Sequence, residues 1–264
     1  RMPLREISQS IGIIGAGPAG LAAAEMLRAK GYAVHVYDRY DRVGGLLIYG
    51  IPNFKLEKSV VNRRTDQLVQ QGIEFHLNCE IGRDVTFEEL RARHDAVLIA
   101  TGVYKAREAP MPGIGLTGVT LALDFLTASN RKGLGDTVDG FEDGTLNAEG
   151  KNVVVIGGGD TAMDCLRTAI RQGAKAVTCL YRRNRANMPG SMREVKNAEE
   201  EGVIFEWLAA PEAILGDDRV SAVRAQRMHL GMPDATGRQT PEPVPDSSFN
   251  IDADLAIMAL GFDP

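Results

Sequence analysis

The chain has 264 residues, of which 44% are hydrophobic and 25% are charged, and its formal net charge is −5. This composition is typical of a globular protein with one large or two modest domains. The negative charge argues against nucleic acid or a membrane surface as a partner, and no apolar run approaches the ~18–20 residues that cross a bilayer.

The cysteines and histidines show none of the patterns of a disulfide framework, a metal site or a catalytic triad. The three cysteines, Cys79, Cys165 and Cys179, include no CxxC pair, so we expect free thiols in the cytoplasm, and the first residues lack the apolar segment of a secretory signal. The four histidines are scattered along the sequence without the spacing of metal ligands. We therefore expect neither a metal site nor a Ser-His-Asp triad.

The chain opens with a predicted strand, a glycine turn and a helix. Residues 12–14 form the strand, 18–30 the helix and 33–37 the next strand, and Pro18 lies in the first helical turn, where a missing N–H costs nothing. The turn has the spacing of a dinucleotide fingerprint: the first glycine permits a sharp bend, the second admits a pyrophosphate and the third lets helix and strand pack. Its residues are Gly15, Ala16, Gly17, Pro18, Ala19 and Gly20. Glycines that merely tighten the turn are the alternative.

Asp38 comes after the second strand, at the position where an acid binds the hydroxyls of a ribose. A solvated carboxylate at a strand end is the alternative. Shortly afterwards, Gly44, Gly45 and Leu46 form a loop that can pass close to a flavin, because glycine has no side chain to obstruct the approach. A simple turn is the other interpretation of this loop.

The next elements alternate between helix and strand. We predict helices at residues 56–71 and 87–93, and strands at 72–77 and 95–102. This alternation indicates a parallel, doubly wound sheet. Residues 103–150 are less regular, with a helix at 121–129 and a loop rich in glycine, aspartate and asparagine at 133–150.

From residue 152 the opening pattern begins again. A strand at 152–156, a helix at 160–172 and a strand at 176–180 surround a second glycine turn. Its residues are Gly157, Gly158, Gly159, Asp160, Thr161 and Ala162. We expect Asp160 to cap the helix as well as to lie near a bound cofactor.

The two units differ in the residues after their second strand. Tyr181 stands where the first unit has Asp38, and Arg182, Arg183 and Arg185 come next. Guanidinium groups can pair with a 2′-phosphate that no carboxylate repels. A solvated basic turn is the alternative. One chain with two different dinucleotide sites suggests a flavoprotein that takes hydride from NADPH.

The last part of the chain closes the second unit. We predict a helix at 191–201, with Glu199–Glu201 as its solvated end, and strands at 203–207 and 220–228, the latter opening a hairpin. Asp254–Gly261 then repeats the spacing of Asp95–Gly102. The repeat of both the glycine turn and this closing strand indicates two related domains.

Several motifs together resemble the small (beta) subunits of NADPH-dependent glutamate synthases. They are Gly15-Ala-Gly-Pro-Ala-Gly20, Gly44-Gly-Leu-Leu-Ile-Tyr-Gly-Ile-Pro52, Gly157-Gly-Gly-Asp-Thr-Ala-Met-Asp-Cys165, Tyr181-Arg-Arg-Asn-Arg-Ala-Asn-Met-Pro-Gly190, Arg193–Gly202 and Ala259-Leu-Gly-Phe262. The fold expected is α/β, with two Rossmann-like dinucleotide-binding domains of the FAD/NAD(P)-linked, glutathione-reductase-like type, their parallel sheets flanked by helices. Residues 1–107 would form the N-terminal part of the FAD-binding domain and 108–257 the NADPH-binding domain, and 258–264 would return towards the FAD domain.

The resemblance implies that NADPH gives hydride to FAD, from which electrons pass through iron–sulfur clusters to the glutamate synthase large (alpha) subunit. There glutamate is made from glutamine and 2-oxoglutarate. The first turn, Asp38, Arg39, Gly44, Gly45, Leu46 and Lys55 would contact FAD. The second turn, Arg182, Arg183, Arg185, Ala259, Leu260 and Gly261 would contact NADPH or line its groove. Hydride transfer needs no protein acid or base, so we expect no catalytic side chain.

Family members also have a cysteine-rich first segment and a later Gly-Asp segment that contacts FAD, and neither is in these 264 residues. We therefore expect the interior of a longer protein, with iron–sulfur clusters only in such a first segment or in the partner, and with FAD bound substoichiometrically. A dihydropyrimidine dehydrogenase, a ferredoxin–NADP oxidoreductase and a nucleotide-binding module without turnover are the alternatives. Thioredoxin reductase is disfavoured because its redox cysteine pair is absent.

Overall fold

A computed structural model describes residues 5–107, 109–235, 237 and 239–263. The chain divides into two compact units, Arg1–Val103 and Tyr104–Pro264. The units part between Val103 and Tyr104, a few residues before the boundary expected at residue 107. Each unit has its own parallel sheet and its own hydrophobic core.

The described part of the first unit is built on a four-stranded parallel sheet in the order β3-β2-β1-β4. Its elements are β1 (Ser10–Ile14), α1 (Pro18–Ala29), β2 (Ala33–Tyr37), α2 (Leu46–Tyr49), α3 (Lys58–Gln70), β3 (Ile73–His76), α4 (Phe87–Arg93) and β4 (Ala96–Ile99). Alternate strand residues such as Ile13 and Val36 pack against Leu21 of α1 and Leu68 of α3. Burial of these side chains holds the two helices on one face of the sheet.

The second unit contains, in its described residues, a five-stranded parallel sheet in the order β5-β12-β6-β7-β8. Its elements are β5 (Val119–Leu121), α5 (Ala122–Gly133), α6 (Asp139–Glu142), β6 (Asn152–Ile156), α7 (Asp160–Arg171), β7 (Ala176–Tyr181), the 3-10 helix η1 (Arg185–Asn187), α8 (Met192–Glu200), β8 (Ile204–Trp207) and β12 (Leu255–Met258). Helices α5, α7 and α8 cover one face, where Phe125, Leu166 and Val195 are fully buried. Both parallel sheets flanked by helices are as expected, so the predicted fold class is confirmed.

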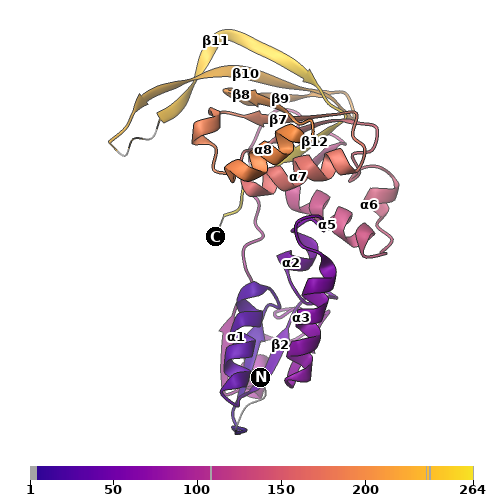
Figure 1. Ribbon diagram of the computed structural model, residues 1–264, viewed down its shortest axis with the longest axis vertical. Helices are drawn as coiled ribbons and strands as arrows, with labels where there is room; N and C mark the ends of the chain where they lie inside the picture. Colours follow the sequence, from indigo (N-terminus) through magenta and orange to yellow (C-terminus); the bar gives the residue numbers. More distant parts are fainter. Residues whose placement is uncertain (1–4, 108, 236, 238, 264) are drawn as a thin grey trace. The chain divides into compact units, whose positions relative to one another are not determined.

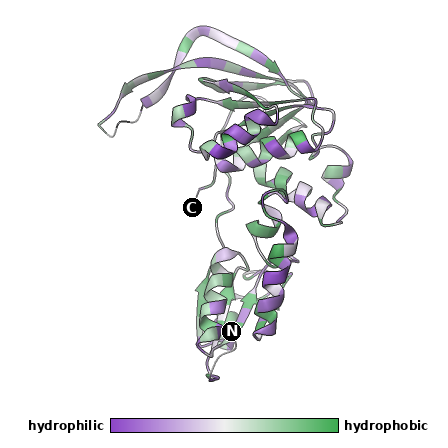
Figure 2. Ribbon diagram, viewed as in Figure 1, coloured by the Kyte–Doolittle hydropathy of each residue, from purple (hydrophilic) through white to green (hydrophobic). Residues whose placement is uncertain are grey.

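A three-stranded antiparallel sheet, β11-β10-β9, covers the other face of the second unit's parallel sheet (Figure 1). Its strands are β9 (Ala209–Gly216), β10 (Val220–Pro233) and β11 (Gln239–Asp252). Ile214 and Val223 pack there against Ile156 and Leu180. Along β10 and β11 the ribbon changes repeatedly between hydrophilic and hydrophobic residues (Figure 2), as expected for strands with one wet face.

The structure corrects several expectations about local structure. Only the first part of β10 was given residue bounds, and the hairpin expected after it is the antiparallel pair β10–β11. Strand β9 was not predicted. Both β9 and β11 contain prolines, such as Pro211 and Pro243, and both lie at edges of the sheet, where proline is tolerated. The region 133–150 contains the short helix α6. Residues after β12 pair with residues 105–107, which lie inside the range expected for the FAD domain: Arg107 N–H donates to Gly261 O at 3.0 Å and Asp263 N–H to Lys105 O at 2.9 Å.

Of the acidic run at the end of α8, Glu200 is exposed as expected, but Glu199 and Glu201 are not solvated. Glu201 accepts from Arg167 Nη2 at 2.7 Å and from Arg171 Nη2 at 2.9 Å, and Glu199 accepts from Arg185 at 2.5 Å. Burial disfavours the ionised form of Glu201, but the hydrogen bonds from Arg171 and Arg167 outweigh it and lower its pKa to about 2. These pairs join α8 to α7 and to η1.

Candidate functional site

The first glycine turn requires glycine at two positions for different reasons. Gly15 has φ +111°, and a side chain there would overlap the backbone oxygen of Ala100. A side chain on Gly20 would overlap Gly15 O, so this glycine sets the contact between α1 and the turn. A Cβ on Gly17 would meet only Gly45 Cα, at 4.0 Å. The turn is therefore closed on the protein side and open above Gly17.

Both glycine turns lead into helices whose first N–H groups are left for a ligand. Gly17 and Gly159 are the N-cap residues of α1 and α7, and among the described residues no side chain caps either helix. A Cβ on Gly159 would meet nothing within 4 Å. Uncapped amides, the helix dipole and open space are what a phosphate group requires. The residues present thus fit a dinucleotide at each turn.

Asp38 joins the first turn to the end of β2. Its Oδ2 accepts from Ala16 N–H at 2.6 Å and its Oδ1 from Tyr40 N–H at 2.9 Å, and the residue is only 9% exposed. It is not the solvated carboxylate of the alternative interpretation. A carboxylate has about four acceptor positions, of which two are occupied here. The remaining positions can accept ribose hydroxyls while the existing bonds hold the carboxylate in place.

The glycine pair after β2 lies against the first turn. Gly44 N–H donates to Ala16 O at 2.9 Å, and Gly44 and Gly45 both have positive φ. Gly45 is the N-cap of α2, which begins at Leu46. The loop is therefore more than a turn, because it lines the open side of the fingerprint at Gly17. Of the other predicted contacts, the Arg39 guanidinium lies 4.9 Å from the Tyr40 ring centre and Lys55 is exposed in the turn after Pro52.

The second turn makes the same backbone hydrogen bond as the first, but a different side chain packs against it. Gly157 N–H donates to Leu180 O as Gly15 N–H donates to Tyr37 O, which confirms that Tyr181 occupies the position of Asp38. A Cβ on Gly158 would lie 2.5 Å from the Tyr181 ring. Tyr181 donates its own hydroxyl to Asn187 O at 2.9 Å. The aromatic ring therefore takes the space that the carboxylate uses in the first unit.

The three arginines after β7 have different surroundings. Arg182 is exposed. Arg183 is partly buried, and its Nε is buried without a hydrogen-bond partner among the described residues. Arg185 forms its ion pair with Glu199 of α8. A buried guanidinium N–H without an acceptor is costly, so an anionic ligand would satisfy it.

Asp160 does not cap α7, contrary to our expectation. Gly159 is the N-cap, and Asp160 is the first helical residue. Its Oδ1 accepts from Ser191 N–H at 2.9 Å, and Gly190 N–H donates to Gly158 O at 2.9 Å. Asp160 thus fastens the segment after η1 to the second turn. No local pattern indicates this contact, since the two partners are far apart along the chain.

A cavity of about 60 Å³ lies at the carboxyl ends of β5 and β12, beside the start of α7. It brings together the predicted residues Thr161, Ala259 and Gly261. Leu121–Asp124 and Tyr104 also line it and were not predicted. Burial raises the pKa of Asp124, which faces this cavity. The carboxyl ends of parallel strands are where α/β sheets bind ligands, which is the signal that could have identified these residues.

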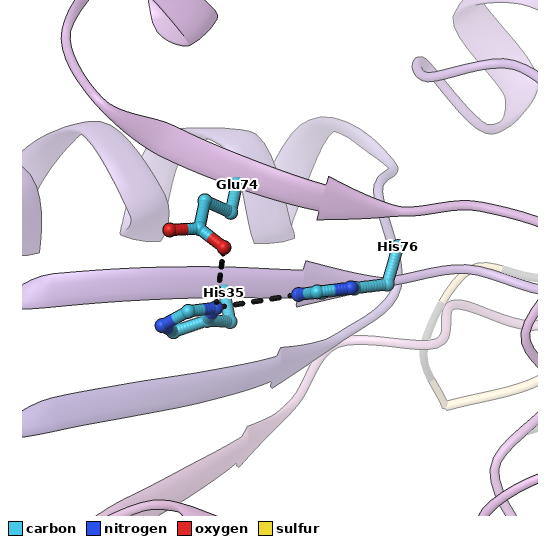
Figure 3. A group of neighbouring side chains, drawn as sticks. All are labelled: His35, Glu74 and His76. Atoms are coloured by element: carbon cyan, nitrogen blue, oxygen red, sulfur yellow. Dashed lines mark hydrogen bonds and ion pairs between the residues drawn. The ribbon is translucent and has the colours of Figure 1, made fainter.

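Three histidines that we described as scattered lie together in the first unit. His35 on β2 and His76 on β3 have their ring nitrogens 3.3 Å apart, and the ring centre of His94 lies 4.9 Å from that of His35 (Figure 3 shows His35 and His76 with Glu74). Spacing along the sequence missed them because neighbouring strands bring distant residues together. The three cysteines, all in described residues, are free thiols. Among the residues that the structure describes, no helix has the length and apolar character needed to span a membrane.

Comparisons with known proteins identify relatives in sequence and in fold. The family model of the pyridine nucleotide-disulphide oxidoreductases matches residues 9–264. Over 264 residues the chain is 66% identical to the glutamate synthase (NADPH) small chain of Azospirillum brasilense, a match that covers 100% of this chain and 55% of that protein. It is 38% identical over 269 residues to the NADPH-Fe(3+) oxidoreductase subunit beta of Geobacter sulfurreducens, covering 99% of this chain and 38% of that one.

Among solved structures, FprA of Mycobacterium tuberculosis in complex with NADPH has the same fold, with a TM-score of 0.80. The two are 21% identical, and the match covers 98% of this chain and 71% of that one. The resemblance drawn from the motifs is confirmed by these matches. The chain spans about half the length of the curated relatives it matches.

Proposed function

Because the chain belongs to the pyridine nucleotide-disulphide oxidoreductase family, we propose that it is the electron-input unit of an NADPH-dependent glutamate synthase. In this role it takes hydride from NADPH and passes the electrons on through FAD. FAD, when bound, supplies the change from two-electron to one-electron transfer. The observation that carries the proposal is the contrast between Asp38 and the Tyr181-Arg182-Arg183 run at equivalent positions of two otherwise matching turns.

The first unit holds FAD in this proposal. The amides at the start of α1 face the pyrophosphate, and Asp38 accepts from the ribose. Gly44, Gly45 and Leu46 border the open side of the same turn, and Arg39 and Lys55 contact the flavin nucleotide from neighbouring loops. Asp38 is already fixed by two backbone N–H groups, so it loses little freedom on binding.

The second unit holds NADPH. The amides at the start of α7 face its pyrophosphate, and Arg182 and Arg183 pair with the 2′-phosphate. The buried Nε of Arg183 has no hydrogen-bond partner among the described residues, and Arg183 comes two residues after Tyr181, whose ring packs on Gly158 of the turn; both observations support this assignment. Thr161, Ala259 and Gly261 line the groove at the carboxyl end of the sheet, as the cavity there supports. We assign Leu260 to the same groove from its place between Ala259 and Gly261, although it packs against the core on the side of the antiparallel sheet. No side chain is assigned a proton-transfer role.

The partner in the proposal is the glutamate synthase large subunit, reached through iron–sulfur clusters. Support comes from the 66% identity to a protein named as the small chain of that enzyme. The free thiols, of which Cys165 and Cys179 are buried, support a reducing compartment such as the cytoplasm. A different acceptor is the second candidate, because one relative is named as a subunit of an NADPH-Fe(3+) oxidoreductase.

The test supplies the full-length protein with FAD and measures oxidation of NADPH and of NADH by an artificial dye. We expect rapid dye reduction with NADPH and slow reduction with NADH. Glutamate should form from glutamine and 2-oxoglutarate only after the large subunit is added. NADPH binding without dye reduction would leave only a nucleotide-binding module, and reduction of ferric or ferredoxin-type acceptors with no coupling to the large subunit would favour the second candidate.

A further inference from the structure

The histidine cluster of the first unit lies on the sheet face opposite α1 and α3. In the parallel register His35 pairs with Glu74 and Tyr37 with His76, so these four side chains point to one face. Their neighbours Val34, Val36, Ile73 and Phe75 point to the other face, into the core with α1. The cluster is therefore separate from both glycine turns, and nothing in the proposed function uses it.

We propose that His35, Glu74 and His76 form a binding site for one divalent late first-row transition metal ion, zinc above all (Figure 3). Two imidazoles and one carboxylate are the ligand set that zinc and its neighbours prefer, whereas magnesium and calcium require more oxygen ligands. The inference is independent of the electron-transfer role proposed above.

Two of the three separations between donor atoms already match those that a tetrahedral ion imposes. His35 Nδ1 lies 3.3 Å from His76 Nε2 and 3.3 Å from Glu74 Oε2, and all three donor atoms lie within 4.8 Å of one another. Metal–ligand bonds of 2.0–2.1 Å at the tetrahedral angle place neighbouring ligand atoms roughly 3.3 Å apart. Only the separation between Glu74 and His76 has to adjust, and Glu74 is an exposed, flexible side chain.

Hydrogen bonds alone do not satisfy this group of atoms. His35 Nδ1 carries at most one proton and has two polar neighbours, His76 Nε2 and Glu74 Oε2, both at 3.3 Å, which is beyond the usual hydrogen-bond range of about 2.7–3.2 Å. A metal ion in place of that proton would bond to all three atoms at once. The Glu74 side chain is 66% exposed and that of His35 22%, so an ion can enter from solvent and water can complete its coordination.

Surrounding side chains hold the imidazoles in place. The His76 ring stacks on Tyr37, with ring centres 4.5 Å apart and planes 14° apart. The His35 ring lies against His94, which is itself fixed by Tyr37 Oη at 2.9 Å and Ser10 Oγ at 3.0 Å. Gly12 leaves room for His94, since a Cβ there would lie 2.7 Å from its ring. Such outer contacts orient metal ligands and reduce the cost of ordering them.

The charges around the site set the expected affinity for the metal ion. His35 and His76 contribute no charge, because imidazoles bind a metal ion in the neutral form. Glu74 contributes one negative charge. Arg93 lies close enough to act electrostatically on His76 and His94, and its positive charge also repels a bound cation. We therefore expect micromolar rather than nanomolar affinity.

The experiment titrates the metal-free protein with zinc chloride by calorimetry, and with cobalt(II) chloride by visible absorption. We expect one ion per chain and, for cobalt, the intense bands of a site with four or five ligands. H35Q and H76Q should each weaken zinc binding by roughly 10- to 100-fold, and E74Q by about 10-fold. Zinc should also raise the melting temperature of the wild type but not of H35Q.

Two control variants separate this site from incidental zinc binding. His229 and Glu242 form an exposed pair 3.6 Å apart with two ligands only, and H229Q should bind zinc like the wild type. Cys79 is the one cysteine that is not buried, and C79S should also bind normally. Unchanged affinity in H35Q and H76Q, or an equal loss in either control, would overturn the proposal, as would the absence of one-to-one binding. Should a histidine variant fail to fold, E74Q at an exposed position decides between the outcomes.

Discussion

The two glycine turns have the same backbone hydrogen bond to the second strand of their unit, but different side chains pack against them. The difference lies in the residue at the end of that second strand, Asp38 in the first unit and Tyr181 in the second. In the first unit Asp38 accepts from Ala16 N–H, and the third position of the turn is Gly20, which has no room for a side chain. In the second unit the Tyr181 ring takes the place of the Asp38 carboxylate and leaves little room for a side chain on Gly158, while the third position of the turn is the buried Ala162. The comparison shows that each glycine requirement depends on the residue packed against it, and not on the fingerprint alone.

The third position of the turn should give the largest effect. In G20A the new methyl overlaps the backbone oxygen of Gly15, which cannot move because Gly15 is itself packed on Ala100. We expect a loss of about 3 kcal/mol in the free energy of unfolding of the first unit and loss of FAD binding. The matched variant A162G should cost about 1 kcal/mol, the usual difference between glycine and alanine in a helix. Thermal melting with flavin fluorescence measures both, and equal effects would contradict the comparison.

The arginines after β7 should give the next largest effect. Each charge-assisted pair with a 2′-phosphate contributes about 1.5–3 kcal/mol, so R182A/R183A should weaken NADPH binding at least about 100-fold and NADH binding little. R185A is the matched control. Because Arg185 already pairs with Glu199, its removal should weaken NADPH binding less. Calorimetric titration with both coenzymes is the measurement. An equal loss for NADPH and NADH would refute the assignment of the second unit.

Ion pairs should make the second unit more acid-sensitive than the first. The pKa of Glu201 in the folded protein is about 2, below its ordinary value of 4.5, so its contribution is complete above pH 4.5 and is lost as the pH falls towards 2. E201Q should lower the free energy of unfolding at pH 7 by about 2 kcal/mol and flatten its dependence on pH in that window.

The control for this prediction is E6Q in the first unit. Glu6 also pairs with an arginine, Arg28, and that hydrogen bond lowers its pKa, but its side chain is 65% exposed. We expect a smaller change than in E201Q. Urea unfolding between pH 3 and 7 distinguishes the two variants. If E201Q kept the slope of the wild type, the stabilising role of the Arg167 and Arg171 contacts would be wrong.

The smallest effect is expected at Gly158. In G158A the methyl meets the Tyr181 ring, a side chain that can rotate away, so the cost should be only about 1 kcal/mol. In a Y181A background the same substitution should cost less, because the obstructing ring is gone. Denaturant unfolding of the wild type, G158A, Y181A and the double variant gives the coupling energy between the two residues directly. Purely additive changes would show that Tyr181 does not impose the glycine.

Much of the fold could be predicted from local sequence. The glycine turns, the strands on either side of them and the helices α1 and α7 follow from backbone requirements and apolar periodicity, which are properties of a short segment. The hairpin of β10 and β11 was expected, but β9 and the bounds of β11 were not predicted; the prolines in these two strands are acceptable only because both lie at sheet edges. The acidic end of α8 was misjudged because its partners lie on another helix.

The candidate site divides in the same way. The sequence by itself determined the two fingerprints, the Asp38–Tyr181 difference and the basic residues beyond Tyr181, because each is a short-range pattern. Only the tertiary structure decided that Asp160 fastens Ser191 instead of capping α7, that Leu121–Asp124 join Thr161 and Ala259 around a cavity, and that His35, Glu74 and His76 meet on one sheet face. The physical reason is that sheet register and helix packing, not proximity along the chain, fix which side chains come within bonding distance.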